Sequence, residues 1–181
     1  MAALTKLEFP AVINQSPHGW YGVAGDERAV SFVTIGHHSA REALQCLERA
    51  QGSEHWVLSS IVRDAADEIA RYLDGEPVNL NRIPVHPAGR TPFQQRVVTA
   101  LRRVPYGTAV SYAELADLAG APSAARAVGT VMSRNRVPLL IPCHRVVGSG
   151  GQLGGFSAPT GIALKRALLD MESEAHVAVH S

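Results

Sequence analysis

The order of apolar and polar positions predicts a β-hairpin near the start of the chain. Residues 20–23 and 30–35 are rich in β-branched and aromatic side chains, and the turn between them, residues 24–27, contains a Gly-Asp pair. A further strand containing Val78 and Leu80 is expected later in the same half. These segments predict a small sheet.

Between these segments the apolar residues recur every three or four positions, a period that predicts helices. One helix follows Ser39, which is expected to form a capping box with Glu42. For a second helix, the helical spacing of apolar residues runs from residue 62 to residue 72, and Gly75 stops the pattern. The first half of the chain is therefore expected to fold as an α/β unit.

Three further helices are expected in the second half. The first begins at Thr91, where a proline and Gln94 complete a capping box, and the next begins at Ser111 with Glu114 in the same role. The last runs from about residue 123 to residue 132. The last two are so close in sequence that they outline a helix-turn-helix, although two adjacent short helices also occur in ordinary core packing.

A short segment rich in proline and glycine, residues 84–90, separates the two halves. We therefore expect two domains: an α/β N-terminal domain with a small sheet, residues 1–86, and a mostly helical C-terminal domain that contains the helix-turn-helix, residues 87–181. With 46% apolar residues, the chain can form a core.

The charged residues divide near the same segment. Residues 1–90 carry 8 basic and 11 acidic side chains, whereas residues 91–170 carry 9 basic and 3 acidic ones. The formal net charge of +1 for the whole chain therefore hides a basic second half. This asymmetry favours a polyanionic partner for the second half.

The last of the expected helices has an unusual composition. Four small residues, Ala124, Ala125, Ala127 and Gly129, surround one long cation, Arg126. Small side chains let a helix backbone come close to another surface. That surface is either a neighbouring element of the core or the minor groove of DNA, with the arginine inserted.

The sequence argues against a membrane or secreted protein. No apolar stretch approaches the length of a membrane span, and the first ten residues contain an acid and a proline where a signal peptide is apolar. We expect a cytoplasmic location. Cys46 and Cys143 lie in different contexts, which argues against a disulfide framework. Cys46 is expected to be a packed helix residue, and no metal site is expected, because the histidines of the first half have no familiar ligand spacing.

Cys143 lies in an apolar run, residues 137–147, that is interrupted by two prolines and by His144 and Arg145. A cysteine in apolar sequence is most often an inert core residue. Burying a histidine and an arginine beside it is costly unless both have defined partners, and a nearby arginine favours the nucleophilic thiolate. The segment is therefore a candidate for cysteine chemistry.

The second half contains a series of motifs between about Arg90 and Glu172: Val104-Pro105-Tyr106-Gly107, Ser111-Tyr112, Ala124-Ala125-Arg126-Ala127-Val128-Gly129, Asn135, Ile141-Pro142-Cys143-His144-Arg145-Val146 and Gly154-Gly155-Phe156-Ser157. In type and order they resemble those of the O6-alkylguanine-DNA alkyltransferases, also called methylated-DNA-protein-cysteine methyltransferases. The motif around the cysteine is the most specific. Over residues 1–89 the resemblance is only architectural.

The resemblance implies a DNA repair enzyme that moves the alkyl group of O6-alkylguanine to its own cysteine, with O4-alkylthymine as a second candidate substrate. Cys143 is the acceptor by similarity, His144 removes the thiol proton through a water, and Glu172 hydrogen-bonds the imidazole. Asn135 ties together the turn before the cysteine segment. A solvated acid and a plain loop asparagine are the competing interpretations of Glu172 and Asn135.

The implied partner is double-stranded DNA containing alkylated guanine, bound in the minor groove with the damaged nucleotide flipped out. By similarity, Arg126 fills the vacated space, and Tyr112 contacts the phosphate and donates a proton or hydrogen bond to the base. Ser111, Ala125 and Ala127 are the other expected DNA contacts. A half-buried aromatic at a helix start is the alternative for Tyr112.

The pocket for the base is expected, by the same resemblance, to be lined by Met132, Pro138, Val146, Phe156 and Ser157. Phe156 stands where many members have tyrosine, so any contact through that hydroxyl is absent. A glycine-rich surface loop is the alternative interpretation of the segment around Phe156 and Ser157.

Two other functions fit parts of the sequence. A non-catalytic protein that binds alkyl lesions has the same fold, but relatives of that kind lack the acceptor cysteine, whereas Cys143 is present. A Cys-His hydrolase needs a separate oxyanion hole, which no motif supplies. We therefore expect a single-turnover methyltransferase that acts as a monomer, without cofactor or metal and with no membrane partner.

Overall fold

The computed structural model describes residues 9–87 and 89–180, and the side chains of these residues as far as Ala175. Residues 1–8, which hold most of the segment considered above in relation to a signal peptide, lie outside the described residues. So does Ala88 in the expected linker. In the part of the chain that is described, no helix has the length and apolar character needed to cross a membrane.

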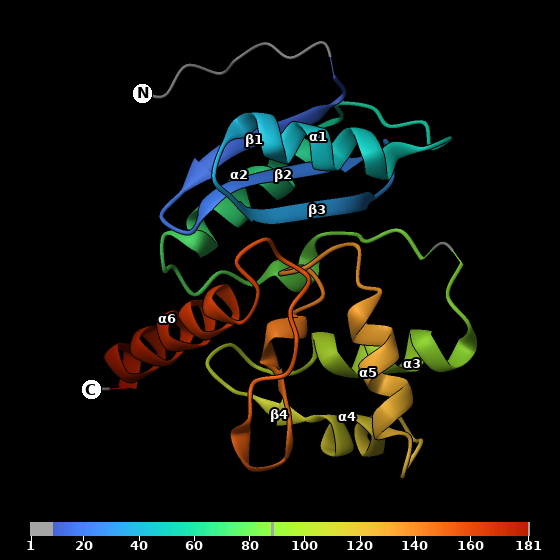
Figure 1. Cartoon of the computed structure of the whole chain (residues 1–181), viewed down its shortest axis with the longest axis vertical. Coiled ribbons are helices and arrows are strands. Elements are labelled where there is room, and N and C mark those ends of the chain that lie inside the picture. The colour runs from blue at the N-terminus through green and yellow to red at the C-terminus, as the bar shows by residue number, and fades with distance from the viewer. Residues whose placement is uncertain (1–8, 88, 181) are drawn as a thin grey trace.

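A three-stranded antiparallel sheet forms the core of the N-terminal half (Figure 1). Its strands are β1 (Ala11–Ser16), β2 (Gly19–Gly25) and β3 (Val30–His37), paired in that order. The predicted hairpin is confirmed by the pairing of β2 with β3. β1 is a strand that the sequence pattern did not indicate, because its last three residues are polar.

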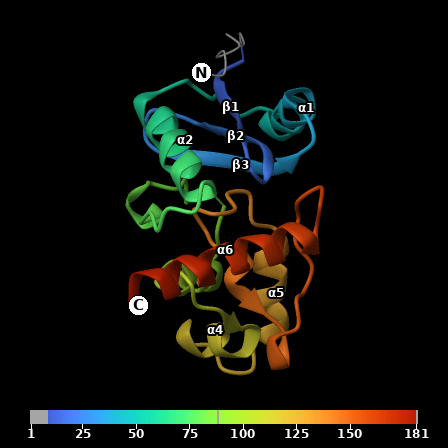
Figure 2. The same ribbon diagram turned by 90° about the vertical axis from the view of Figure 1, so that its left-hand side faces the viewer.

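Two helices pack on the two faces of this sheet (Figure 2). α1 (Ala40–Gln51) covers one face, where its Leu47 lies against Gly22. α2 (Ser60–Leu73) covers the other face, where the Tyr21 hydroxyl donates a hydrogen bond to the helix backbone at 3.1 Å. Neighbouring residues of β2 thus point to opposite faces, as the pleat of a strand requires.

The capping box expected at the start of α1 is incomplete. Ser39 accepts a hydrogen bond from the backbone N–H of Glu42 at 3.2 Å. The Glu42 carboxylate, however, accepts from the N–H of His38 rather than from that of Ser39. The helix still begins where the sequence predicts.

The strand expected at Val78 and Leu80 is wrong. Leu80–Arg82 form a short 3₁₀ helix, η1, in which Leu80 is buried. The side chain of Asn79 accepts a hydrogen bond from the backbone N–H of Asn81 at 3.1 Å. This local bond turns the chain where a strand would have to continue straight.

The C-terminal half is mostly helical. The capping boxes expected at Thr91 and Ser111 are both complete, with Gln94 and Glu114 as partners. In chain order the elements are α3 (Pro92–Arg102), β4 (Val110–Ser111), α4 (Tyr112–Leu118), α5 (Ala125–Ser133), the 3₁₀ turn η2 (Cys143–Arg145), β5 (Val146–Val147), the 3₁₀ turn η3 (Ser149–Gly151) and α6 (Ile162–His180).

A short parallel ladder joins β4 to β5. Val110 pairs with Val146, and Ser111 pairs with Val147. α4 begins directly after β4, and η2 ends directly before β5. The ladder therefore connects the start of the α4–α5 helix pair to the cysteine segment.

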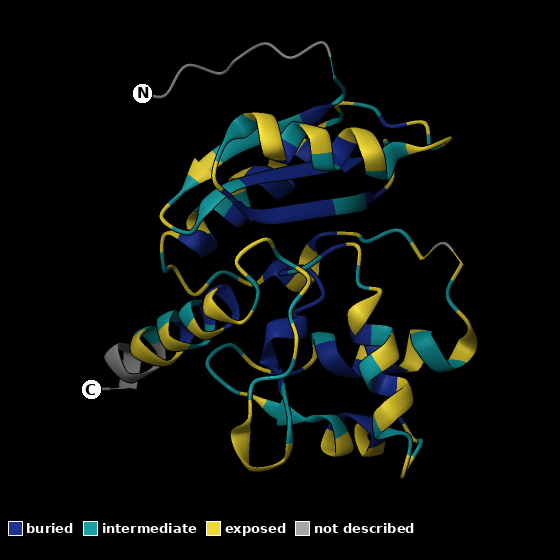
Figure 3. Cartoon of the chain, viewed as in Figure 1, coloured by how far each residue is buried: buried dark blue, intermediate teal, exposed yellow. Residues whose placement is uncertain are grey.

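One continuous buried core joins the two halves of the chain. Figure 3 shows that buried positions occur in both halves. The core contains residues of the sheet, of α2, of the C-terminal helices and of the segment before the cysteine, among them Tyr21, Val33, Tyr72, Leu101, Leu140 and Leu168. A smaller cluster under α1 is formed by Ala11, Ala24, Leu47 and Trp56. The halves are therefore packed together through apolar side chains.

Arg136 joins the segment after α5 to the N-terminal half. Its Nη1 lies 2.5 Å from Oε1 of Glu54, and its Nη2 donates to the carbonyl oxygen of Ala50 at 3.0 Å. Its guanidinium lies over the ring of Phe32, and its backbone carbonyl accepts from the N–H of Val33 at 2.9 Å. The segment that leads to the cysteine is thus fixed against the sheet.

The substitution Gly36→Ala is expected to destabilise the contact between the halves. Gly36, in β3, has a φ of +79°, and a Cβ there would lie 2.7 Å from Cδ2 of the buried Leu164 in α6. We expect a loss of about 2–5 kcal/mol in the free energy of unfolding, because the left-handed backbone and the crowding both oppose the new methyl group.

The matched control is Gly120→Ala, where φ is +64° but no atom lies within 4 Å of the added Cβ. This variant should lose about 1–2 kcal/mol from backbone strain alone. Chemical denaturation measures both losses, and equal losses would contradict the role given to the contact with Leu164.

Candidate active site

Cys143 lies at the start of η2 and is held by the side chain of Asn135. Nδ2 of Asn135 donates to Sγ of Cys143 at 3.1 Å and to the carbonyl oxygen of Ile141 at 2.9 Å. Its Oδ1 accepts from the N–H of Val137 at 3.1 Å. One side chain therefore joins the start of the apolar run to its middle, at Val137 and Ile141, and contacts the sulfur.

The thiol of Cys143 has a raised pKa because it is buried, with only 9% of the residue exposed. The hydrogen bond from Asn135 and the positive charge of Lys165 oppose this shift only in part. The expectation that Arg145 favours the thiolate is wrong, because its guanidinium is bonded to Glu172 instead. The sulfur therefore needs a base to become a nucleophile.

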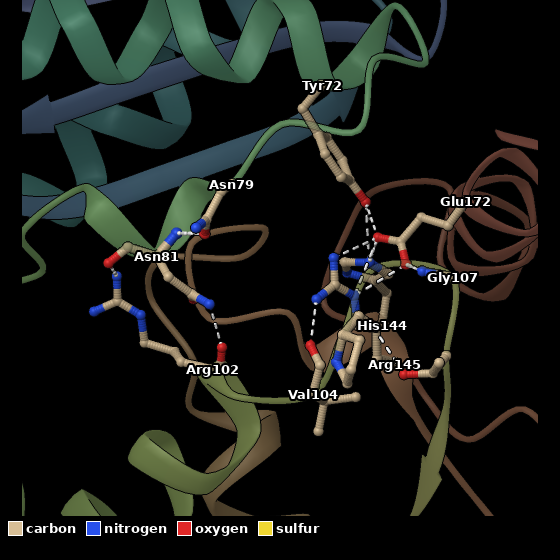
Figure 4. A network of polar contacts seen from close by, with 11 residues as sticks. Tyr72, Asn79, Asn81, Arg102, Val104, Gly107, His144, Arg145 and Glu172 are labelled. Carbon is tan, nitrogen blue, oxygen red and sulfur yellow. Dashed lines mark hydrogen bonds and ion pairs between the residues drawn. The ribbon is translucent and has the colours of Figure 1, made fainter. Parts of the chain in front are cut away.

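His144, the residue after Cys143, forms a buried pair with Glu172 of α6 (Figure 4). Nε2 of His144 lies 2.9 Å from Oε1 of Glu172. Burial lowers the pKa of His144, which favours the neutral imidazole. Its Nδ1 is also buried and has no hydrogen-bond partner among the described residues. With Nε2 protonated toward the carboxylate, Nδ1 carries the free lone pair.

The Glu172 carboxylate accepts hydrogen bonds from three further residues, Arg145, Gly107 and Tyr72. Arg145 donates through Nε, to Oε2 at 3.0 Å, and through Nη2, to Oε1 at 2.9 Å. The backbone N–H of Gly107 donates at 3.0 Å, and the hydroxyl of Tyr72 in α2 donates at 2.5 Å. Burial alone would raise the pKa of Glu172, but the hydrogen bonds and charges of His144 and Arg145 outweigh it and lower the pKa to about 2.

A cavity of about 630 Å³ opens in front of the thiol. Besides Cys143, it is lined by six of the site residues predicted from the sequence: Tyr112, Met132, Asn135, Pro138, Phe156 and Ser157. Val146 is not among the lining residues. It is fully buried, and its carbonyl oxygen accepts a hydrogen bond from Nζ of Lys165 at 2.6 Å.

Another part of the cavity wall belongs to the N-terminal half. β3 contributes Phe32 and Thr34, and α1 contributes Cys46. Cys46 lies on a helix, as expected, but it is only half-buried. It also borders the cavity, where its Sγ accepts a hydrogen bond from the Thr34 hydroxyl at 3.4 Å. Within the described residues, no three histidine, cysteine, aspartate or glutamate side chains gather as a metal site.

The residues singled out for DNA contact lie on and around the α4–α5 helix pair. Arg126 and Ala127 are exposed near the start of α5, and Ala125 and Ser111 are half-buried. In the described part of the chain, no residue forms a hydrogen bond or an ion pair with the Arg126 side chain. The guanidinium is therefore free to contact a partner.

Two residues that contact this site were not identified from the sequence. Tyr72 falls on the apolar face of a predicted helix, a position that indicates core packing, although the hydroxyl of a buried tyrosine usually has a hydrogen-bond partner. Lys165 shares a face of α6 with Leu168 and Glu172, three and seven positions further along. That helical spacing is the signal that could have indicated a buried lysine.

Known proteins share both the sequence and the fold. Residues 92–174 match the family model of the 6-O-methylguanine DNA methyltransferase, DNA binding domain. The methylated-DNA–protein-cysteine methyltransferase of Mycobacterium bovis is 41% identical over 140 residues, which cover 76% of this chain and 82% of that protein. The enzyme of the same name from Methanosarcina acetivorans is 33% identical over 161 residues, 88% of this chain and 96% of that protein.

A solved structure supports the same relation. The crystal structure of Mycobacterium tuberculosis OGT in complex with DNA superposes with a TM-score of 0.71 at 34% identity, over 90% of this chain and 92% of that one. The similarity thus extends over the sheet and α2 as well as over the cysteine segment. The chain belongs to the family of the methylated-DNA–protein-cysteine methyltransferases.

Proposed function

We propose that this protein repairs double-stranded DNA by moving the alkyl group from O6 of guanine to Sγ of Cys143, irreversibly and once per molecule. One observation carries the proposal: the thiol borders an open cavity, and the next residue is a neutral histidine with a free ring nitrogen. Membership of the family supports the same reaction. A protein that only binds lesions would have no use for this thiol and base.

The proposed reaction is a displacement at a saturated carbon. Sulfur forms a bond to the alkyl carbon while the bond from that carbon to O6 breaks, and guanine leaves with the electron pair. The thiol proton passes through a bridging water to Nδ1 of His144, and the ionised Glu172 stabilises the resulting imidazolium. The thioether product has no activated carbonyl for water to attack, so the thiol is not regenerated.

In this proposal Tyr112 supplies a hydrogen bond or a proton to the leaving base. It borders the same cavity as Cys143, and burial raises its pKa, so the hydroxyl stays protonated at neutral pH. A neutral phenol can donate as negative charge develops on guanine. The hydroxyl of Ser157 is the proposed donor to the guanine oxygen, with Phe156 packed near the base.

The α4–α5 pair is the proposed DNA-binding element, a helix-turn-helix. Its small residues Ala125 and Ala127 let α5 approach the minor groove, Ser111 lies at the start of α4, and Arg126 enters the duplex in place of the flipped nucleotide. The basic excess of residues 91–170 supports attraction to phosphates.

We also propose that residues 1–86 and 87–181 are the two domains and that Asn135 acts as the hinge residue beside the acceptor. Its three hydrogen bonds support this role. A cytoplasmic location is proposed on the basis of two free cysteines, which suit a reducing compartment.

The substitution Cys143→Ser is expected to abolish alkyl transfer. The protein is incubated with duplex DNA containing labelled O6-methylguanine, and intact mass spectrometry measures the methyl groups gained by each molecule. Wild-type protein should gain one methyl group and then stop. Cys46→Ser is the control, because it also removes a thiol that borders the cavity. Uptake of label by the Cys143→Ser protein would contradict the proposed acceptor.

The substitution Gly154→Ala is expected to slow alkyl transfer by about tenfold, because correct placement of a donor is lost. A Cβ on Gly154 would lie 2.8 Å from the hydroxyl oxygen of Tyr112, so the phenol must move. The neighbouring Gly155→Ala adds the same methyl group with no atom within 4 Å and should react at the wild-type rate. Single-turnover kinetics at saturating DNA measures both rates, and equal rates would argue against the position given to Tyr112.

The substitution Arg126→Ala is expected to slow repair of duplex DNA by roughly tenfold or more while leaving reaction with the free modified base nearly unchanged, since only the duplex requires nucleotide flipping. Arg63→Ala, which removes an exposed arginine from α2, controls for the loss of one charge. Rates are measured on both substrates. A similar loss on duplex and on free base would rule out the inserted role.

A further inference from the structure

One side chain of the N-terminal half reaches the His144–Glu172 pair. Tyr72 is 1% exposed and projects from α2 toward α6 (Figure 4). Its hydroxyl lies 2.5 Å from Oε1 of Glu172 and 3.0 Å from Nε2 of His144. These partners are 100 and 72 residues away in the chain. The contact is therefore a product of how the two halves pack.

The protonation states of the three groups follow from one another. Glu172, with a pKa of about 2, is ionised at neutral pH and can only accept, so the Tyr72 hydroxyl donates its single proton to Oε1. Toward His144 the hydroxyl oxygen can then only accept a hydrogen bond. Both neighbours of Nε2 are thus acceptors, which requires a proton on Nε2 and leaves Nδ1 as the basic nitrogen.

Arg145 also acts on both members of the pair, because it hydrogen-bonds to Glu172 and its positive charge lowers the pKa of His144. It forms no hydrogen bond with His144, and the remaining described groups around the pair each act on one group. The backbone of Gly107 donates to Glu172, and the ring of Tyr106 packs edge-on against Tyr72 at 5.9 Å. The charge of Lys165 acts on His144 from a greater distance than a hydrogen bond. Among the described residues, Tyr72 is the side chain that hydrogen-bonds to both His144 and Glu172.

We propose that Tyr72 is a positioning residue for alkyl transfer, which holds the Glu172 carboxylate and keeps His144 in the tautomer whose Nδ1 is free to take the thiol proton. This inference rests on the proposed function for the role of His144 as the base. It gives the N-terminal half a part in the chemistry, although that half carries none of the motifs around the cysteine.

The substitution Tyr72→Phe tests the proposal, because it keeps the ring and removes only the hydroxyl. In the wild-type protein, Oε1 of Glu172 accepts hydrogen bonds from the phenol, from the Nε2–H of His144 and from Nη2 of Arg145. Without the phenol, the same negative charge is shared by the Nε2–H and Arg145 only, and the imidazolium is favoured. The pKa of His144 should therefore rise, by about half a unit or more.

Two measurements are needed. ¹⁵N NMR of the histidine ring follows the pKa and the tautomer of His144 directly, and single-turnover kinetics at saturating DNA between pH 5 and about pH 9 gives the rate constant. We expect a raised NMR pKa, the same displacement of the acidic limb of the pH–rate profile, and a rate about tenfold lower at neutral pH, since the imidazole has lost one contact that fixes it. The affinity for DNA should be unchanged.

Tyr21→Phe is the matched control. It removes the hydroxyl of another fully buried tyrosine, which donates to the carbonyl oxygen of Ala66 in α2 and accepts from Asn14, and which contacts neither His144 nor Glu172. It should lower stability to a similar extent with a wild-type pKa for His144. If Tyr72→Phe leaves the pKa of His144 unchanged, or changes it only as Tyr21→Phe does, a structural role accounts for the residue and the proposal is overturned.

The outcomes also separate this inference from the proposed function. If the wild-type protein transfers no alkyl group, the proposed function fails, whereas the NMR titration of His144 still reports on Tyr72. If the wild-type protein is active and Tyr72→Phe matches it in rate and pH dependence, only the role of Tyr72 is wrong.

Discussion

The buried negative charge of Glu172 is the constraint around which the two halves of the protein are arranged. A carboxylate that is 1% exposed is stable only if donors surround it, and here they come from α2, from the turn before β4 and from η2. Removing one partner of a buried charge typically costs about 3–5 kcal/mol. The interface between the halves and His144, the proposed base, are therefore parts of the same hydrogen-bonded structure.

Cys143, the proposed nucleophile, is fixed by a second set of contacts that also crosses between the halves. Asn135 holds the sulfur and the backbone before it, and the next residue, Arg136, is bound to Glu54 and Ala50 in the N-terminal half. Thiol and base are thus each anchored to the N-terminal half by a different route. This half supports the geometry of the site as well as forming part of its cavity wall.

Sequence patterns predicted the structural features that are fixed by residues close together in the chain. The hairpin of β2 and β3 and the capping boxes at Thr91 and Ser111 are confirmed, since their signals lie within a few residues. Local bonds also explain one failure, because Asn79 turns the chain where a strand was expected. The partners of Tyr72 and Arg145 could not be predicted, because they are fixed by packing between distant segments, and the family resemblance named Glu172 without naming what surrounds it.

The parallel pairing of β4 with β5 involves only two residues of each strand, yet it joins the two activities that a single repair event has to combine. The helix pair that would follow the DNA surface begins on one strand, and the turn with the thiol ends on the other. A shift of one residue in this register would move every backbone group of one segment past the other. In the proposed reaction, the position of the sulfur relative to the DNA-binding helices would therefore depend on this backbone pairing, before any side chain contacts the base.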